Sequence, residues 1–361
     1  MNFKEVAEMR LHIQQVTSTK FSTAKELVSW MGAIKAQDYA MAKWAIGVRT
    51  MNSTQTDSDK AIDKGEIIRT HLLRPTWHFV SSADIYWMLE LTAPQIRVLM
   101  RSRDKQLGLS ESIYKKSNSI IRKAFTEGKN FTRDELISKL EKAKIATNEF
   151  RSGHFMLRAE LDGIVCSGES IVNKPTYALL EQRVSAANTL CKEEALKKLA
   201  LKYFMSHGPA TLADFTWWSG LPVRDAKNAL EMIQPRLLSE TIAKQQYWFA
   251  ANFFHGTKTK SPALLLPAFD EFLISYKDRT VSIALENHSK AFTTNGIFFP
   301  TIVVNGRVKG FWKRSIKKDK ILIEASPLKP FSATTKKLVN KAAKNYGKFI
   351  GKKSEVIYPA D

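Results

Sequence analysis

The chain has 361 residues and carries 56 Lys and Arg against 35 Asp and Glu, a formal net charge of +21. With 44% apolar and 25% charged residues, the composition is that of a folded globular protein and excludes global disorder. Two cysteines are too few for a disulfide framework or a zinc site, and no apolar stretch reaches the length of a membrane span. The positive charge favours nucleic acid as the partner, because such a field concentrates polyanions. We therefore expect a cytoplasmic, nucleoid-associated protein.

One plan repeats three times along the chain: a helix that starts at a Ser or Thr cap, a short turn, a second helix and a β-hairpin. In the first unit, residues 1–109, Thr23 opens a helix that Gly32 ends. The remaining elements expected here are helices over Tyr39–Arg49 and Ser58–Lys64, strands over Glu66–Leu72 and Pro75–Val80, and a long amphipathic helix from Asp84.

The second unit spans residues 110–190. Thr132 and Glu135 have the spacing of a capping box ahead of apolar residues at helical intervals. A further helix is expected from Asn148 to Leu161, followed by two paired strands at Ile164–Cys166 and Thr176–Leu179.

The third unit, residues 191–255, shows the plan most clearly. Thr211 and Asp214 form a predicted capping box, Gly220 ends that helix, and Pro222 suits the first turn of the next. This arrangement is typical of a winged helix-turn-helix, in which the second helix enters a DNA groove. The candidate DNA contacts on that helix are Arg224, Lys227 and Asn228.

From residue 256 to 361 the pattern changes to short strands. Asn305-Gly306 is a strong two-residue hairpin signal between two of them. The segment from Thr301 onward holds fifteen Lys and Arg against four Asp and Glu, so about half of the net charge lies there. The sequence therefore predicts an α+β protein in which three tandem winged helix-turn-helix domains precede a small, basic, β-barrel-like domain. The strands are expected at Ala263–Leu266, Ile297–Val304, Arg307–Trp312, Ile321–Ala325 and Val356–Tyr358, with a helix at Ser332–Tyr346.

Five stretches, taken in order, resemble the winged-helix DNA glycosylases of the AlkZ/YcaQ type. They cover the chain nearly end to end: GAIKAQD (Gly32–Asp38), IRTHLLRPTWHF (Ile68–Phe79), HGPAT (His207–Thr211), LLPAFDE (Leu265–Glu271) and FPTIVVNGR (Phe299–Arg307) through Lys313-Arg314. The resemblance implies three tandem winged helices around a C-terminal β-barrel. It also implies hydrolysis of the N-glycosidic bond of alkylated purines, including the unhooking of interstrand cross-links.

The resemblance further implies a catalytic motif of Gln, an intervening residue, then Gln or Asp. Here the matching positions are Lys35, Ala36 and Gln37, followed by Asp38, so Lys replaces the first Gln. Gln37 suits the positioning of a water, and Asp38 either accepts its proton or, as we prefer, caps the next helix. For Lys35 three interpretations stay open, in this order: a phosphate contact, a site that has lost activity, and an amine nucleophile.

Other candidate positions are weaker. Arg69 and Arg74 are expected to contact phosphate, whereas a structural role is preferred for His71 and for His78, which is retained as a candidate DNA contact. Asp270 and Glu271 are expected to pair with Lys277 or Arg279, and Trp217 and Trp218 to lie in the core, although base stacking is the alternative. Three further candidate DNA contacts lie in the basic C-terminal region: Arg307, Lys313 and Arg314.

Two functions remain in competition. The first is a monofunctional DNA glycosylase, a DNA repair hydrolase that acts on alkylation damage with Gln37 holding the water. The second is a non-catalytic winged-helix DNA-binding protein, either a regulator or a damage recogniser. Both imply double-stranded DNA as partner, no membrane, no metal and no small-molecule cofactor. Three unlike units in one chain favour a monomer on a single duplex.

Overall fold

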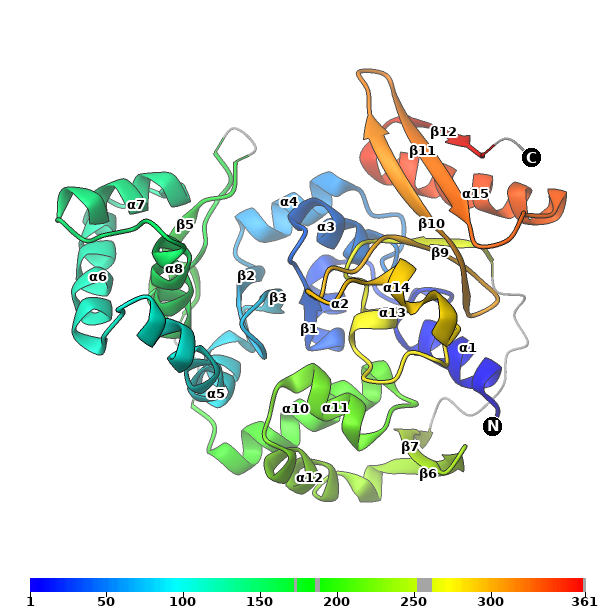
Figure 1. Ribbon diagram of the computed structural model, residues 1–361, viewed down its shortest axis with the longest axis horizontal. Coiled ribbons are helices and arrows are strands. Elements are labelled where there is room, and N and C mark those ends of the chain that lie inside the picture. Colours follow the sequence, from blue (N-terminus) through cyan, green and yellow to red (C-terminus); the bar gives the residue numbers. More distant parts are fainter. Residues whose placement is uncertain (172–173, 186–188, 252–261, 360–361) are drawn as a thin grey trace.

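The computed structural model describes residues 1–171, 174–185, 189–251 and 262–359. They form a mixed α+β protein, as the sequence predicts. In Figure 1 the first unit occupies the centre and the second unit stands out as a separate lobe. The helices of the third unit lie on one side of the centre, and the C-terminal sheet with its long helix lies on the opposite side.

The first unit builds a small sheet between its helices. α2 (Ala24–Met31) begins after Thr23 and ends at Gly32 (φ +75°), as expected, and Thr23 and Glu26 form a capping box. The unit continues with β1 (Ala33–Lys35), α3 (Tyr39–Gly47), α4 (Gln55–Asp63), β2 (Ile67–His71) and β3 (Trp77–Ser81). β3 lies between β1 and β2, and both pairings are antiparallel. β1 was not predicted, because three residues are too few to show an alternating pattern.

The second unit follows α5 (Ile85–Gln106), a long helix that connects it to the centre. Its capping box at Thr132 and Glu135 is confirmed. Its core is separate, with Leu136, Leu140 and Phe155 among the buried residues. The elements are α6 (Glu111–Ala124), α7 (Arg133–Lys142), α8 (Arg151–Leu161), β4 (Val165–Ser167), β5 (Tyr177–Leu179) and α9 (Leu180–Arg183).

The third unit confirms the local predictions most fully. Thr211 and Asp214 form the capping box of α11, and Gly220 closes it in the left-handed conformation with φ +69°. The elements are α10 (Lys192–His207), α11 (Leu212–Ser219), α12 (Val223–Glu231), β6 (Leu237–Ile242) and β7 (Gln245–Ala250). In each unit a strand or single bridge after the first helix pairs with the hairpin: β1 with β3, Phe131 with Tyr177, and Ala210 with Trp248.

The C-terminal region forms a five-stranded sheet in the order β12-β11-β10-β9-β8. Asn305 (φ +50°) and Gly306 (φ +71°) make the predicted tight turn between β9 and β10. α15 contacts β8 at one edge of the sheet and β12 at the other, so the sheet curls around this helix as an open half-barrel. The elements are β8 (Leu264–Leu266), α13 (Glu271–Ile274), α14 (His288–Ala291), β9 (Thr301–Val304), β10 (Arg307–Ile316), β11 (Lys320–Pro327), α15 (Ala333–Ile350) and β12 (Lys353–Ile357).

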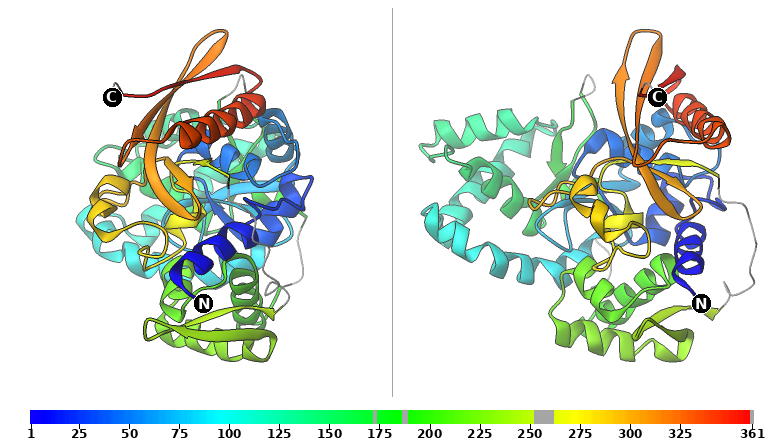
Figure 2. Two further views of the ribbon diagram at one scale, coloured as in Figure 1. Left: turned by 90° about the vertical axis from the view of Figure 1, so that its right-hand side faces the viewer. Right: turned by 45° about the vertical axis from the view of Figure 1, so that its right-hand side comes forward.

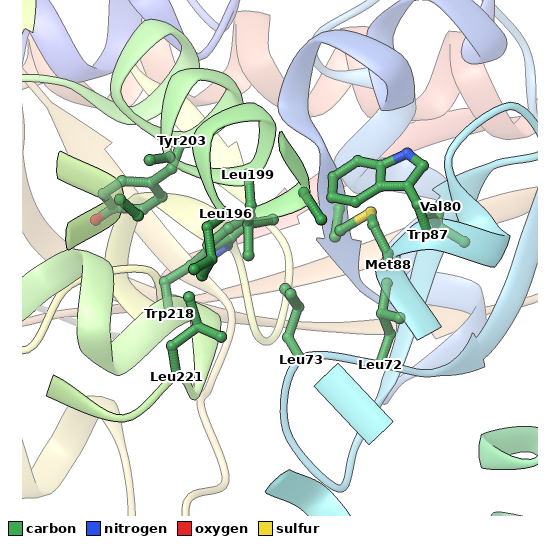
Figure 3. Packing of buried hydrophobic residues seen from close by; sticks show 14 of the residues in the cluster. Leu72, Leu73, Val80, Trp87, Met88, Leu196, Leu199, Tyr203, Trp218 and Leu221 are labelled. Atoms are coloured by element: carbon green, nitrogen blue, oxygen red, sulfur yellow. The ribbon is translucent and has the colours of Figure 1, made fainter. Parts of the chain in front are cut away.

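Hydrophobic contacts connect units that are far apart in sequence. Figure 3 shows Leu72 and Leu73 of the first unit facing Leu196, Leu199 and Trp218 of the third unit in one buried cluster. The N-terminal helix α1 (Phe3–Ile13) packs in another cluster with C-terminal residues. The predicted domain boundaries stay predictions, and the one between 255 and 256 lies outside the described residues.

Candidate active site

The residues that match the catalytic motif lie where β1 ends and α3 begins. Lys35 is the last residue of β1, pairs with His78 of β3, and is 5% exposed. Gln37 is exposed. Asp38 caps α3, because its Oδ1 accepts a hydrogen bond from the Met41 backbone N–H at 3.0 Å. The preferred interpretation of Asp38 as a helix cap is therefore what the structure shows, and Gln37 is the most exposed residue of the motif.

Lys35 lies in a polar but largely enclosed environment. Its backbone N–H donates to Oε1 of Glu271 at 2.6 Å, and its ammonium group contacts the hydroxyl of Thr76. Burial lowers the pKa of Lys35 well below its usual value; the charge of Arg74 lowers it further, and Glu271 opposes the shift. The amine therefore faces the protein interior, with a hydroxyl as its hydrogen-bond partner.

Glu271, which accepts from Lys35, is itself only 1% exposed. The hydroxyl of Ser275 donates to it, and Nε2 of His207 lies 3.7 Å from its Oε2. Burial would raise the pKa of Glu271, but His207, Ser275 and the Lys35 N–H together hold it below its usual value. The buried carboxylate is thus stabilised as an anion directly behind the end of β1.

The neighbouring carboxylate, Asp270, belongs to a second buried pair. Arg49 donates two hydrogen bonds of 2.8 Å to its two oxygens, and Oε1 of Gln14 accepts a third from the same guanidinium at 3.1 Å. Gln14 in turn donates to the Tyr276 hydroxyl at 2.9 Å. The expected pairing of Asp270 and Glu271 with Lys277 or Arg279 is therefore wrong. The chain turns both carboxylates inward, where they join the first unit to the C-terminal region.

The two histidines of the first unit are engaged inside the protein. Nδ1 of His71 lies 2.8 Å from Oε2 of Glu160, which comes from α8 of the second unit. His78 is 2% exposed, and its Nδ1 lies 2.9 Å from the Thr76 carbonyl oxygen. Burial, and then the charges of Lys35 and Arg74, lower the pKa of His78 well below its usual value. These contacts support the structural role preferred for both residues.

Several predicted DNA contacts have partners within the protein. Nε of Arg69 donates to the Ala36 carbonyl at 3.0 Å, directly before Gln37, and its guanidinium lies 4.4 Å from the centre of the Trp77 ring. Arg307 donates to two backbone carbonyls at 2.8 Å, and Arg314 donates to the Tyr346 hydroxyl. The candidates whose side chains are exposed are Arg224, Lys227, Asn228 and Lys313.

The basic C-terminal region presents its charge on a protruding hairpin. Figure 2 shows the β10–β11 hairpin extending beyond the body of the molecule. Its tip carries exposed lysines at 317, 318 and 320. Such a projection provides a positively charged surface for a polyanion.

Neither His207 nor Arg49 was predicted as part of the site, and Glu271 was a weaker candidate with a different expected partner. His207 begins a stretch that carries the family resemblance, as Glu271 ends one, and this is the signal that could have indicated it. Within the described ranges, no three His, Cys, Asp or Glu side chains gather as metal ligands. Nor does any described helix have the length and apolar character needed to cross a membrane.

Comparison with known proteins identifies the family. Residues 28–349 match the family described as DNA glycosylase AlkZ-like. The chain is 22% identical over 327 residues to the interstrand DNA cross-link repair glycosylase of Streptomyces sahachiroi, covering 86% of this chain and 88% of that relative. Its structure matches that of Streptomyces sahachiroi DNA glycosylase AlkZ with a TM-score of 0.82 at 18% identity, covering 99% of this chain and all of the other, so the two share a fold. The chain belongs to the AlkZ-like DNA glycosylase family.

Proposed function

We propose that this DNA repair glycosylase hydrolyses the N-glycosidic bond of alkylated purines in duplex DNA, with Gln37 holding the attacking water. The observation that carries the proposal is the contrast within the motif: Gln37 is exposed, whereas Lys35 is buried and Asp38 caps α3. Among the described residues no hydrogen bond commits the Gln37 amide to the protein, so it can bind a water. The relative from Streptomyces sahachiroi is named for interstrand cross-link repair, and we extend the proposed substrates to cross-linked purines.

The chemistry requires little from the protein beyond positioning. A purine alkylated at N7 or N3 carries a positive charge and leaves without a general acid. The sugar then develops oxocarbenium character, and a water must be held on its far face. An amide can both donate to and accept from that water and so orient it. It takes up no proton, so the proton that the water loses on bonding to the sugar carbon passes to solvent.

Lys35 is proposed to support the site and not to attack the sugar. Its amine faces Thr76 and its backbone N–H is held by Glu271, so both ends of the residue fix the strand that leads to Gln37. A phosphate contact would require a more exposed side chain, because only 5% of Lys35 is exposed. Attack by the amine on the sugar carbon would leave a Schiff base and a broken strand, which the experiment below detects.

The repeated element order and the charge support DNA as the substrate. We infer that the three units are winged helices that contact a single duplex, with one chain acting as a monomer and without a cofactor. The exposed Arg224, Lys227 and Asn228 lie on α12, the position of the recognition helix in the third unit. The exposed lysines of the β10–β11 hairpin add charge.

The loss of the first Gln of the motif favours one competing function, a DNA-binding protein without glycosylase activity. The two functions make different predictions for the same assay. Duplexes carrying N7-methylguanine, N3-methyladenine or an N7-linked interstrand cross-link are incubated with excess wild type, Gln37→Ala, Lys35→Gln or the exposed control Gln106→Ala. Base release is read as strand breaks that require alkali.

We expect release by wild type and Gln106→Ala, and a loss of about 100-fold in Gln37→Ala, the cost of losing the position of a reactant, with duplex affinity retained. Lys35→Gln restores the family pattern and should retain or increase release. Tight binding without release by wild type and Lys35→Gln would establish the non-catalytic function. Breaks without alkali, together with borohydride trapping that Lys35→Gln abolishes, would instead identify Lys35 as a nucleophile.

A further inference from the structure

Three cations from two separate chain segments surround one tryptophan beside the candidate active site. The Trp217 ring, in α11, has the guanidinium carbon of Arg74 at 4.8 Å from its centre. The Lys277 ammonium lies 4.9 Å from the same centre, and the guanidinium carbon of Arg279 lies 5.3 Å from it. Arg74 comes from the β2–β3 turn, whereas Lys277 and Arg279 follow α13. We call these four residues the Trp217 cluster.

The ring is fixed and is not available for stacking on a base. The Trp217 indole N–H donates to the Ile274 carbonyl at 2.9 Å, which sets the ring orientation. Because an indole has only two faces, cations over it from three residues leave little open surface for a nucleobase. The neighbouring Trp218 is 2% exposed and lies in the core, as expected. Trp217 therefore serves to hold the cations together, through cation–π contacts.

No salt bridge to a described residue holds the cations of the Trp217 cluster, although the charges of nearby carboxylates act on two of them: Glu271 on Arg74, and Asp214 and Asp278 on Arg279. Because each cation lies about 5 Å from one ring centre, no two are more than about 10 Å apart. Within the described part of the chain, none of the three forms a salt bridge. The two carboxylates that act on Arg279 also have other partners: Asp214 pairs with Arg10 and accepts from the Lys277 backbone N–H at 2.8 Å, and Asp278 accepts from Thr280.

Two of the cations, Arg279 and Arg74, show the effect of placing like charges close together in a partly buried position. Burial, and then the charge of Arg74, lower the pKa of Arg279 to about 10, so it is still charged at neutral pH. Its Nε donates to the Leu273 carbonyl at 3.1 Å and its Nη1 to the Lys277 carbonyl at 3.3 Å, so a phosphate would be reached chiefly through Nη2. Nε of Arg74 is buried and has no hydrogen-bond partner among the described residues. A concentration of like charge with an unsatisfied buried donor is the environment that an anion stabilises.

The Trp217 cluster is continuous with the end of β1. Arg74 and Thr76 share the β2–β3 turn, where the Thr76 N–H donates to the Arg74 carbonyl at 2.6 Å, and the Thr76 hydroxyl contacts the Lys35 ammonium group. The turn that carries Arg74 is held against the third unit at Gly220, where a Cβ would lie 2.3 Å from the Leu73 carbonyl oxygen. The cluster is thus fixed relative to the strand that leads to Gln37.

We propose that the Trp217 cluster binds one phosphodiester of the DNA backbone beside the damaged nucleotide, with Arg74, Lys277 and Arg279 as its ligands. Arginine is suited to bidentate phosphate recognition, and contacts of this kind fix the register of a protein on a duplex. The phosphate would supply the negative charge that the cluster lacks. The inference rests on the proposed function, since it takes damaged duplex DNA as the ligand.

The test is DNA binding, which does not depend on base release. Wild type, Lys277→Gln, Arg279→Gln and the exposed control Lys116→Gln on α6 bind a duplex with a tetrahydrofuran abasic analogue at several salt concentrations. Each lost phosphate contact should reduce the slope of log affinity against log salt by about 1. Because Lys277 is exposed, Lys277→Gln should keep the fold. Thermal unfolding tests whether Arg279→Gln is also folded.

A second readout locates the phosphate. A single neutral methylphosphonate near the abasic analogue should weaken binding by wild type at one position and weaken binding by Arg279→Gln less at that position, because Arg74 and Lys277 remain as ligands. Slopes equal to that of Lys116→Gln, or equal losses by wild type and Arg279→Gln at every position, would overturn the inference. If wild type releases no base and the slope still changes, the phosphate site stands while the proposed function fails. If base is released and the slope is unchanged, only the phosphate site fails.

Discussion

The ion pair between Arg49 and Asp270 allows a direct test of the buried network behind the site. Two hydrogen bonds of 2.8 Å join the groups, and their side chains are 0% and 3% exposed. Burial alone would lower the pKa of Arg49, but Asp270 more than offsets this and raises it. Asp270→Asn keeps the size of the side chain and leaves Arg49 charged and buried without its counter-ion.

Breaking a buried pair by neutralising one partner costs about 3–5 kcal/mol of the free energy of unfolding. We expect a loss of this size for Asp270→Asn and also for Arg49→Met. The double variant removes both charges, so its loss should be smaller than the two single losses added together, by about 2 kcal/mol or more. The matched control is Glu181→Gln, which breaks the exposed pair with Arg122 and should cost about 0–1 kcal/mol.

Urea unfolding at 25 °C measures these losses. Circular dichroism and tryptophan fluorescence must report the same midpoint, because only a single cooperative transition defines one free energy. A loss for Asp270→Asn no larger than that of Glu181→Gln would refute the reasoning. So would a double variant whose loss equals the sum of the two single losses, because the pair would then be uncoupled.

Three further outcomes follow from single contacts. Gly220→Ala should lose more stability in urea than Gly108→Ala. Both glycines have positive φ and share the left-handed strain of about 1–2 kcal/mol, but a Cβ has nothing within 4 Å at Gly108. The folded pKa of Glu160 lies below its usual 4.5, so the stabilisation that its carboxylate provides is present above pH 4.5 and is lost as the pH falls below it. The free energy of unfolding should therefore fall less steeply with decreasing pH in Glu160→Gln than in wild type. An unchanged slope in acid would contradict this. The folded pKa of Lys35 lies below its usual 10.5, so between these two values the unfolded chain binds more protons than the folded chain. The free energy of unfolding therefore rises with pH toward 10.5. Lys35→Met should therefore be more stable than wild type at pH 7, by a margin that shrinks toward pH 10; a constant margin in unfolding scans would exclude the effect.

Local features could be predicted because their partners lie within a few residues. The capping boxes at Thr23, Thr132 and Thr211 each join residues three apart, and the sequence places both partners. The Asn305-Gly306 turn likewise depends on its own two residues, which take the positive φ that the turn requires. The predicted cap at Asp38 follows the same logic. By themselves, these signals determined the order of helices and hairpins.

Tertiary structure decided the site itself. Lys35 and Glu271 are joined across 236 residues of sequence, and Arg49 and Asp270 across 221. The expectation that Glu271 and Asp270 would pair with nearby cations was wrong, because hydrogen bonds to buried partners outweigh proximity in sequence once both carboxylates lose water. Likewise, charge alone marked Arg69 and Arg307 as DNA contacts, whereas folding gave them backbone carbonyls as partners. The sequence specifies which groups are available, but burial determines which of them must be satisfied inside the protein and which stay exposed to a ligand.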